Sequence, residues 1–123
     1  MSTIRKQALI VEDDAWIRRF MCDVLADERY GVLEAADGSS GIRLATEHSP
    51  DLVLLDLALP GVTGVDVIRS LKRSRRTRHV PVVVLSAYPR VLSSGDAQSV
   101  AQVLAKPVDV DCLLEVIQQC IVN

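Results

Sequence analysis

Apolar residues follow two alternating patterns along this chain. Five short runs are almost continuously apolar, which is typical of strands that are covered on both faces. The segments between them carry apolar residues three and four positions apart, the spacing of one helix face. The five runs span 8–11, 32–36, 52–55, 82–85 and 102–105. Because strand patterns and helix patterns alternate, the sequence predicts a parallel sheet built from β–α units.

The first helix has the clearest signals. Asp14 precedes it as a candidate N-cap, and Gly31 follows it as the expected stop. The predicted inward face consists of Ile17, Phe20, Met21, Val24 and Leu25. Further helices are expected over 39–48, over 64–74 and after Asp109. The helix pattern is poor over 88–100, so only a short or irregular helix is expected there.

Five strands and about five helices fit one α/β architecture, a doubly wound open sheet with helices on both faces. Right-handed crossovers give this sheet the strand order 2-1-3-4-5. In such sheets, ligands bind beyond the carboxyl ends of the strands, at the point where the strand order reverses. Here that point lies between the first and third strands.

Composition limits the class of protein. At 123 residues, with 49% hydrophobic and 24% charged residues, the chain is expected to fold as one domain, 1–123. A net charge of −2 argues against a globally basic protein that binds nucleic acid or membranes. Residues 1–7 lack the apolar core of a signal peptide, and no run is long enough to span a membrane, so we expect a cytoplasmic protein. Cys22, Cys112 and Cys120 are expected to be reduced core residues.

Acidic residues follow two of the predicted strands. Glu12 and Asp13 come directly after the first strand, and Asp56 ends the third. Because these strands are expected to be neighbours, the carboxylates should meet at one edge of the sheet. Like charges about 4 Å apart repel by about 4 kcal/mol at an effective dielectric constant near 20, so the cluster needs a cation or a proton. Asp14 is adjacent, but strand alternation directs it elsewhere, consistent with an N-cap.

Four short motifs carry a resemblance to a known family. They are Val11-Glu12-Asp13-Asp14, the segment 56–61 with the following Gly64, Ser86-Ala87, and Lys106-Pro107. Each follows a predicted strand, and together they resemble the receiver domain of bacterial two-component response regulators over essentially the whole chain. The resemblance implies a flavodoxin-like fold and a single receiver domain, with no output domain in this chain. It also implies a cis peptide bond between Lys106 and Pro107.

The resemblance implies a role for each site residue. Asp56 would accept a phosphoryl group from a histidine kinase or a phosphotransfer protein, assisted by Lys106 and the hydroxyl group of Ser86. Mg²⁺ would be held by Glu12, Asp13, Asp56 and the backbone carbonyl of Ala58, with Asp13 as the more direct ligand and Glu12 acting mainly through water. Carboxylates and carbonyls are ligands that Mg²⁺ prefers. The chain would then be a signalling switch and not an enzyme that turns over a metabolite.

The chain departs from the family at one switching position. Val103 stands where receivers usually carry tyrosine or phenylalanine, three residues before the lysine. Valine cannot swing a ring between exposed and buried positions, so we expect weaker or different coupling to the surface of the fourth helix, fifth strand and fifth helix.

Segment 88–100 is expected to be the most mobile part of the chain. Within it, Tyr88 either limits the approach of water to the phosphoryl group or is a half-exposed loop residue.

Two alternative functions remain open. The chain could be a receiver-like interaction module that is never phosphorylated, an alternative that Val103 keeps open. It could also be a Mg²⁺-dependent aspartyl-phosphate phosphatase, although Ala58 stands where such enzymes carry an acid.

The basic stretch 69–79 is expected to be solvated surface, and an acidic protein is a better partner for it than nucleic acid. We expect a downstream protein target, no membrane contact, no direct nucleic-acid binding, and a monomer or weak dimer.

Overall fold

The computed structural model describes residues 5–122 and contains one five-stranded parallel sheet. The strands are β1 (Gln7–Val11), β2 (Gly31–Ala35), β3 (Leu52–Asp56), β4 (Val82–Ser86) and β5 (Gln102–Ala105). Their order is β2-β1-β3-β4-β5, and every neighbouring pair is parallel. The predicted strand order and the doubly wound fold are therefore confirmed.

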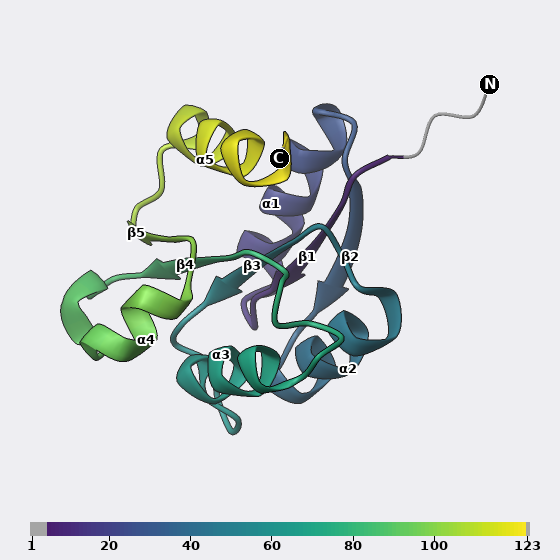
Figure 1. The fold of residues 1–123 in the computed structure, drawn as a ribbon. Helices are drawn as coiled ribbons and strands as arrows, with labels where there is room; N and C mark the ends of the chain where they lie inside the picture. The colour runs from purple at the N-terminus through teal and green to yellow at the C-terminus, as the bar shows by residue number, and fades with distance from the viewer. Residues whose placement is uncertain (1–4, 123) are drawn as a thin grey trace.

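Helices cover both faces of the sheet. They are α1 (Ala15–Asp27), α2 (Gly38–His48), α3 (Gly64–Arg73), α4 (Ser94–Ser99) and α5 (Val110–Val122), with a 3₁₀ helix, η1, at Pro89–Val91. Figure 1 shows α1 and α5 on one side of the sheet and α2 and α3 on the other, with α4 near α3. Within residues 5–122, no helix is long and apolar enough to cross a membrane. The short α4 and η1 agree with the irregular segment predicted over 88–100.

Strand alternation divides the core into two apolar layers. Leu9 and Val11 of β1 pack toward α2 and α3, whereas Ala8 and Ile10 pack toward α1 and α5. All five residues of β3 are buried, as expected for a central strand. Fully burying a side chain of this kind contributes about 1.5–3 kcal/mol, and a shift of one residue would exchange the two faces. The core therefore fixes the register that aligns the ends of β1 and β3.

Two predictions about α1 are wrong. Ile17 and Phe20 were expected to face inward, but they are 40% and 56% exposed. They line a cavity of about 450 Å³ between the beginning of α1 and the beginning of α5, which neighbouring side chains do not fill. The helix also ends at Asp27, before the expected stop. Arg29 takes the left-handed conformation after it, and Gly31 begins β2.

The cysteines are all free, but they are not all core residues as expected. Cys22 is buried, Cys120 is half-buried and Cys112 is exposed. Cys112 lies on the outer face of α5, because the inward face of that helix is formed by Leu113, Ile117 and Ile121.

Candidate functional site

The fold brings three acidic side chains together at the carboxyl edge of the sheet. Glu12 and Asp13 directly follow β1, and Asp56 is the last residue of β3. Val11 is paired with Leu55 between these strands, so the acidic residues that follow lie side by side. Each of Glu12, Asp13 and Asp56 offers one carboxylate oxygen, and these three oxygens lie within 4.8 Å of one another. The convergence expected from the sequence is present.

Burial distinguishes the three acids. Glu12 and Asp56 are only 1% and 4% exposed, whereas Asp13 faces solvent. The backbone N–H of Glu12 donates to Ala35 O at 3.0 Å, which holds the beginning of the β1–α1 loop to β2. Asp14 turns away from the cluster: its Oδ1 accepts hydrogen bonds from the backbone N–H groups at the beginning of α1. Asp14 is therefore the N-cap that was predicted.

Glu12 is held in a setting that favours its protonated form. Burial is the main cause that raises the pKa of Glu12, and Asp56 raises it further. A hydrogen bond from Asp14 N to Glu12 Oε2, at 3.1 Å, and the charge of Lys106 act in the opposite direction. The result is a pKa of about 7. Without a bound cation, the charge of Lys106 therefore does not neutralise the carboxylates of this cluster.

Lys106 supplies the cation nearest to these acids. It directly follows β5, and its Nζ lies 3.1 Å from Asp56 Oδ2 and 3.8 Å from Glu12 Oε1. Its backbone N–H donates to Ser86 O at 2.9 Å, which aligns the ends of β5 and β4. The peptide bond between Lys106 and Pro107 is cis, as the resemblance implied. A flexible ammonium group in this position can interact with Asp56 or with an anion bound beside it.

Ser86 and Ala58 lie at the same edge of the sheet. Ser86 ends β4 and is buried, and its Oγ accepts a hydrogen bond from Tyr88 N at 3.0 Å. The backbone N–H of Ala58 donates to Asp56 Oδ1 at 3.1 Å, which orients that carboxylate. Within residues 5–122, the hydroxyl group of Ser86 donates no hydrogen bond to another group, so its proton is available to an oxygen bound at the site.

The donor set fits a hard divalent cation. All three side chains offer carboxylate oxygens, the ligands that hard cations such as Mg²⁺ and Ca²⁺ prefer. Glu12 Oε1 is buried and has no hydrogen-bond partner among the described residues. Such an orphaned acceptor is costly unless a cation or an ordered water satisfies it. The acidic cluster therefore could hold a metal ion.

Arg18 supports the site and was missed by reasoning from the sequence. Its Nη1 donates to Glu12 O at 2.8 Å, and its Nε lies 3.3 Å from Glu34 Oε1 on β2. These contacts join the beginning of α1 to the loop that carries Glu12 and Asp13. The only signal in the sequence is an arginine one turn after the N-cap, a spacing common on exposed helices, so it could not have been identified in advance.

The structure also shows the surroundings of Tyr88 and Val103, two further residues singled out from the sequence. Tyr88 is 78% exposed, more than the half-exposed loop residue that was one of its two interpretations. Val103 is half-buried on β5 and packs against the layer beneath α2 and α3. A fixed aliphatic side chain thus occupies the position where the family usually has a ring.

The fold and the site together define a class of protein: doubly wound α/β domains with an acidic, oxygen-rich site at the strand-order reversal. Comparison with known proteins narrows this class. The family model of the response regulator receiver domain matches residues 8–118. The chain belongs to the response regulator receiver family.

Relatives with curated descriptions agree. The polar-differentiation response regulator DivK of Brucella ovis is 31% identical over 118 residues, which cover 92% of this chain and 94% of DivK. The phosphate regulon transcriptional regulatory protein PhoB of Escherichia coli is 44% identical over 82 residues, which cover 67% of this chain and 36% of PhoB. The match thus spans about a third of PhoB.

Solved structures share the whole fold. A sensor protein from Polaromonas sp. JS666 has a TM-score of 0.89 and 28% identity, with 98% of each chain covered. The receiver domain of the sensor histidine kinase PA1611 from Pseudomonas aeruginosa has a TM-score of 0.85 and 26% identity, covering 98% of this chain and all of that one. That structure contains a magnesium ion coordinated in its active site cleft.

Proposed function

We propose that this receiver domain is a phosphorylation-dependent signalling switch in which Asp56 accepts a phosphoryl group. The observation that carries the proposal is the ion pair between Lys106 and a buried Asp56, with two further acids beside it. A carboxylate that is buried, oriented by the Ala58 N–H and adjacent to a cation has the position of a nucleophile for phosphorus. The proposed donors are a histidine kinase or a phosphotransfer protein, which carry phosphohistidine.

The transfer forms one bond and breaks one. A carboxylate oxygen of Asp56 attacks phosphorus in line with the departing imidazole nitrogen of the donor. The bond between phosphorus and nitrogen breaks, its electron pair stays on the nitrogen, and the imidazole takes up a proton. Lys106 moves from Asp56 toward a phosphoryl oxygen, while the hydroxyl group of Ser86 donates a hydrogen bond to another. Catalysis of this kind depends on positioning and electrostatics.

The metal that supports this reaction is proposed to be Mg²⁺. Glu12, Asp13, Asp56 and the backbone carbonyl of Ala58 would hold it, with the orphaned Glu12 Oε1 acting directly or through water. When bound, it would neutralise negative charge on the carboxylates and on the phosphoryl oxygens. Asp13 is the best placed of the three acids to meet an ion that arrives from solvent, because it is the exposed one.

The residue at position 58 argues for a switch over a phosphatase. A phosphatase that works through an aspartyl phosphate uses a second acid near the nucleophile to protonate the leaving group, and Ala58 has no such group. Water can still attack the acyl phosphate slowly, which returns the domain to its original state. The protein is thus proposed to catalyse only its own phosphorylation and dephosphorylation, and to act through contacts with a downstream protein.

The test is chemical identification of the bond. Incubation with a radiolabelled small phosphodonor such as acetyl phosphate, with Mg²⁺, should label the protein. Treatment with hydroxylamine should release the label, because hydroxylamine cleaves acyl phosphates and leaves phosphoserine and phosphothreonine intact. A label that resists hydroxylamine, or that forms equally with excess chelator in place of Mg²⁺, would contradict the proposal. The alternative of an interaction module that is never phosphorylated predicts no label.

A further inference from the structure

Positive charge is concentrated in one short segment of this acidic protein. Residues 69–79 contain six of the fourteen lysines and arginines and no acidic residue. The rest of the chain then has eight cationic and sixteen acidic side chains, a net charge of −8. Residues 69–79 therefore form a positively charged segment in a chain whose remaining charge is negative.

Two of the six cations are held by contacts with other elements of the fold, while Arg73 Nε donates to Arg69 O of its own helix at 3.3 Å. Lys72 is half-buried, and its Nζ donates to Arg78 O at 3.2 Å and to Val80 O at 2.9 Å. Arg69 forms two hydrogen bonds to the carboxylate of Asp96 on α4, at 3.2 and 3.0 Å. The other four arginines are exposed, and no acidic group of residues 5–122 lies within 4.0 Å of their charged groups. These four are Arg73, Arg75, Arg76 and Arg78, and we call them the arginine ridge.

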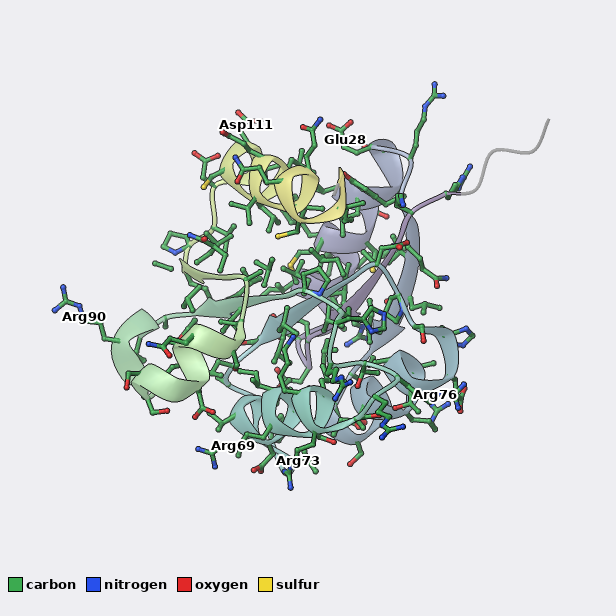
Figure 2. The ribbon with its side chains drawn as sticks, viewed as in Figure 1. Glu28, Arg69, Arg73, Arg76, Arg90 and Asp111 are labelled. Carbon is green, nitrogen blue, oxygen red and sulfur yellow. The ribbon has the colours of Figure 1, made fainter. Side chains whose placement is uncertain are left out.

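The backbone that carries the arginine ridge is fixed. Thr77 is fully buried and its Oγ1 donates to Leu71 O at 2.7 Å, while Arg78 N donates to Ser74 O at 2.8 Å. With the two bonds from Lys72, these contacts anchor the loop between α3 and β4 at several points. Arg73 projects from α3 away from the sheet (Figure 2). A surface whose backbone is already ordered loses less entropy when it binds a partner.

The arginine ridge lies far from the acidic cluster. Helix α3 begins at Gly64, whose N–H donates to Leu57 O just beyond the end of β3, and it runs toward the opposite edge of the sheet. Its 10 residues span about 15 Å at 1.5 Å per residue. This exceeds the Debye length of about 10 Å at 0.1 M salt, so charges at the two ends of α3 interact weakly. An occupant of the ridge would therefore respond little to the charge state of Asp56.

We propose that the arginine ridge is a docking surface for a carboxylate-rich segment of a partner protein, and that it binds independently of phosphorylation at Asp56. Arginine binds carboxylates through two parallel hydrogen bonds, and the Arg69 contact with Asp96 shows this geometry at the edge of the same surface. Residues 69–79 contain no aromatic side chain on which a nucleobase could stack. The negative charge of the remaining surface would also repel an extended polyanion such as duplex DNA.

The test measures binding of a fluorescent octaglutamate peptide by anisotropy. The triple variant Arg73→Gln, Arg75→Gln, Arg76→Gln should weaken binding about tenfold. A control with the same change in net charge, Arg5→Gln, Arg19→Gln, Arg90→Gln, should bind like the wild type, because these exposed arginines lie outside the ridge. All six positions are exposed, so both variants should fold, which circular dichroism checks. Phosphorylation with acetyl phosphate and Mg²⁺ should leave the affinity unchanged within about twofold.

Four results would overturn the proposal. The first is that octaglutamate does not bind even at low salt. The second is an equal loss of affinity in both triple variants, which would assign binding to net charge alone. The third is tighter binding of duplex DNA, or of vesicles containing phosphatidylglycerol, that depends on the ridge. The fourth is a large change in affinity on phosphorylation, which would remove the independence from Asp56.

Discussion

The ammonium group of Lys106 lies 3.1 Å from Asp56 Oδ2, so the ends of β5 and β3 are joined electrostatically across β4. Glu12 Oε1 lies 3.8 Å from the same nitrogen. One cation therefore contacts the two buried carboxylates of a cluster of three. This imbalance of charge is the physical basis of the proposed metal requirement.

Replacing Lys106 with methionine should slow phosphorylation of the domain. The change removes the charge that would stabilise a phosphoryl oxygen, and loss of one such contact typically costs about 10²- to 10³-fold in rate. The measurement is the rate at which acetyl phosphate modifies the protein at saturating Mg²⁺. Lys6→Met is the matched control, because Lys6 is exposed and lies outside the site. An equal effect of both substitutions would contradict the proposed role of Lys106.

The free energy of unfolding of the metal-free protein should depend on pH through Glu12. The pKa of Glu12 is raised from 4.5 to about 7 in the folded protein, so the folded state binds more protons than the unfolded state in this interval. The contribution of Glu12 is thus present below about pH 4.5 and is lost as the pH rises through about 7. The loss is on the order of 3 kcal/mol, at 1.36 kcal/mol per pKa unit.

Glu12→Gln should remove most of this pH dependence and stabilise the metal-free protein near pH 8. The amide keeps the shape of the side chain, carries no charge and can donate a hydrogen bond to Asp56. Urea unfolding at several pH values provides the measurement, and the exposed Glu115→Gln provides the control. If Glu12→Gln unfolds with the same pH profile as the wild type, the account of its burial is wrong.

Mg²⁺ should stabilise the folded protein, and Asp13→Asn should weaken this effect. A ligand at 100 times its Kd that binds only the folded state stabilises it by about 2.7 kcal/mol. The neighbouring Asp14→Asn is a close control, because asparagine caps a helix about as well as aspartate and Asp14 lies outside the cluster. Thermal unfolding with and without Mg²⁺ provides the measurement. Equal loss of the Mg²⁺ effect in both variants would argue against a site centred on Asp13.

Phosphorylation should change the surface of α4, β5 and α5 only weakly. Val103 is a half-buried valine with no ring to move, so it cannot couple the site to this surface as an aromatic residue would. Nuclear magnetic resonance spectra of the phosphorylated and unmodified protein should differ mainly near Asp56 and Lys106. Large shifts throughout α4, β5 and α5 would contradict weak coupling.

The sequence predicted those parts of the structure that depend on local pattern. The buried strands appear in the sequence as continuous apolar runs. The ends of these runs indicated where Glu12, Asp13 and Asp56 would meet. The prediction of the inward face of α1 was less reliable, because the spacing of apolar residues identifies a helix face but does not say whether another element covers it. Ile17 and Phe20 were expected in the core for this reason, yet they line a cavity beside α5.

Other features depend on contacts that no local pattern encodes. Arg18 supports the Glu12 loop through one hydrogen bond to a carbonyl group, and any exposed arginine has the same appearance in the sequence. Arg29 takes a left-handed conformation usually adopted by glycine, so the nearby Gly31 was mistaken for the end of α1. The role of Arg18 depends on a tertiary contact. The end of α1 is closed by local hydrogen bonds, from Arg29 N to Ala26 O and from Tyr30 N to Leu25 O, at residues whose preferences did not mark a helix end.

The central claim is that Asp56 accepts a phosphoryl group. Mass spectrometry of the intact protein and of its peptides, after incubation with acetyl phosphate and Mg²⁺, tests this claim most directly. The account predicts one added phosphoryl group on the wild type, located at Asp56, and none on Asp56→Asn. An adduct of equal abundance on Asp56→Asn, or an unmodified wild type under these conditions, would contradict it.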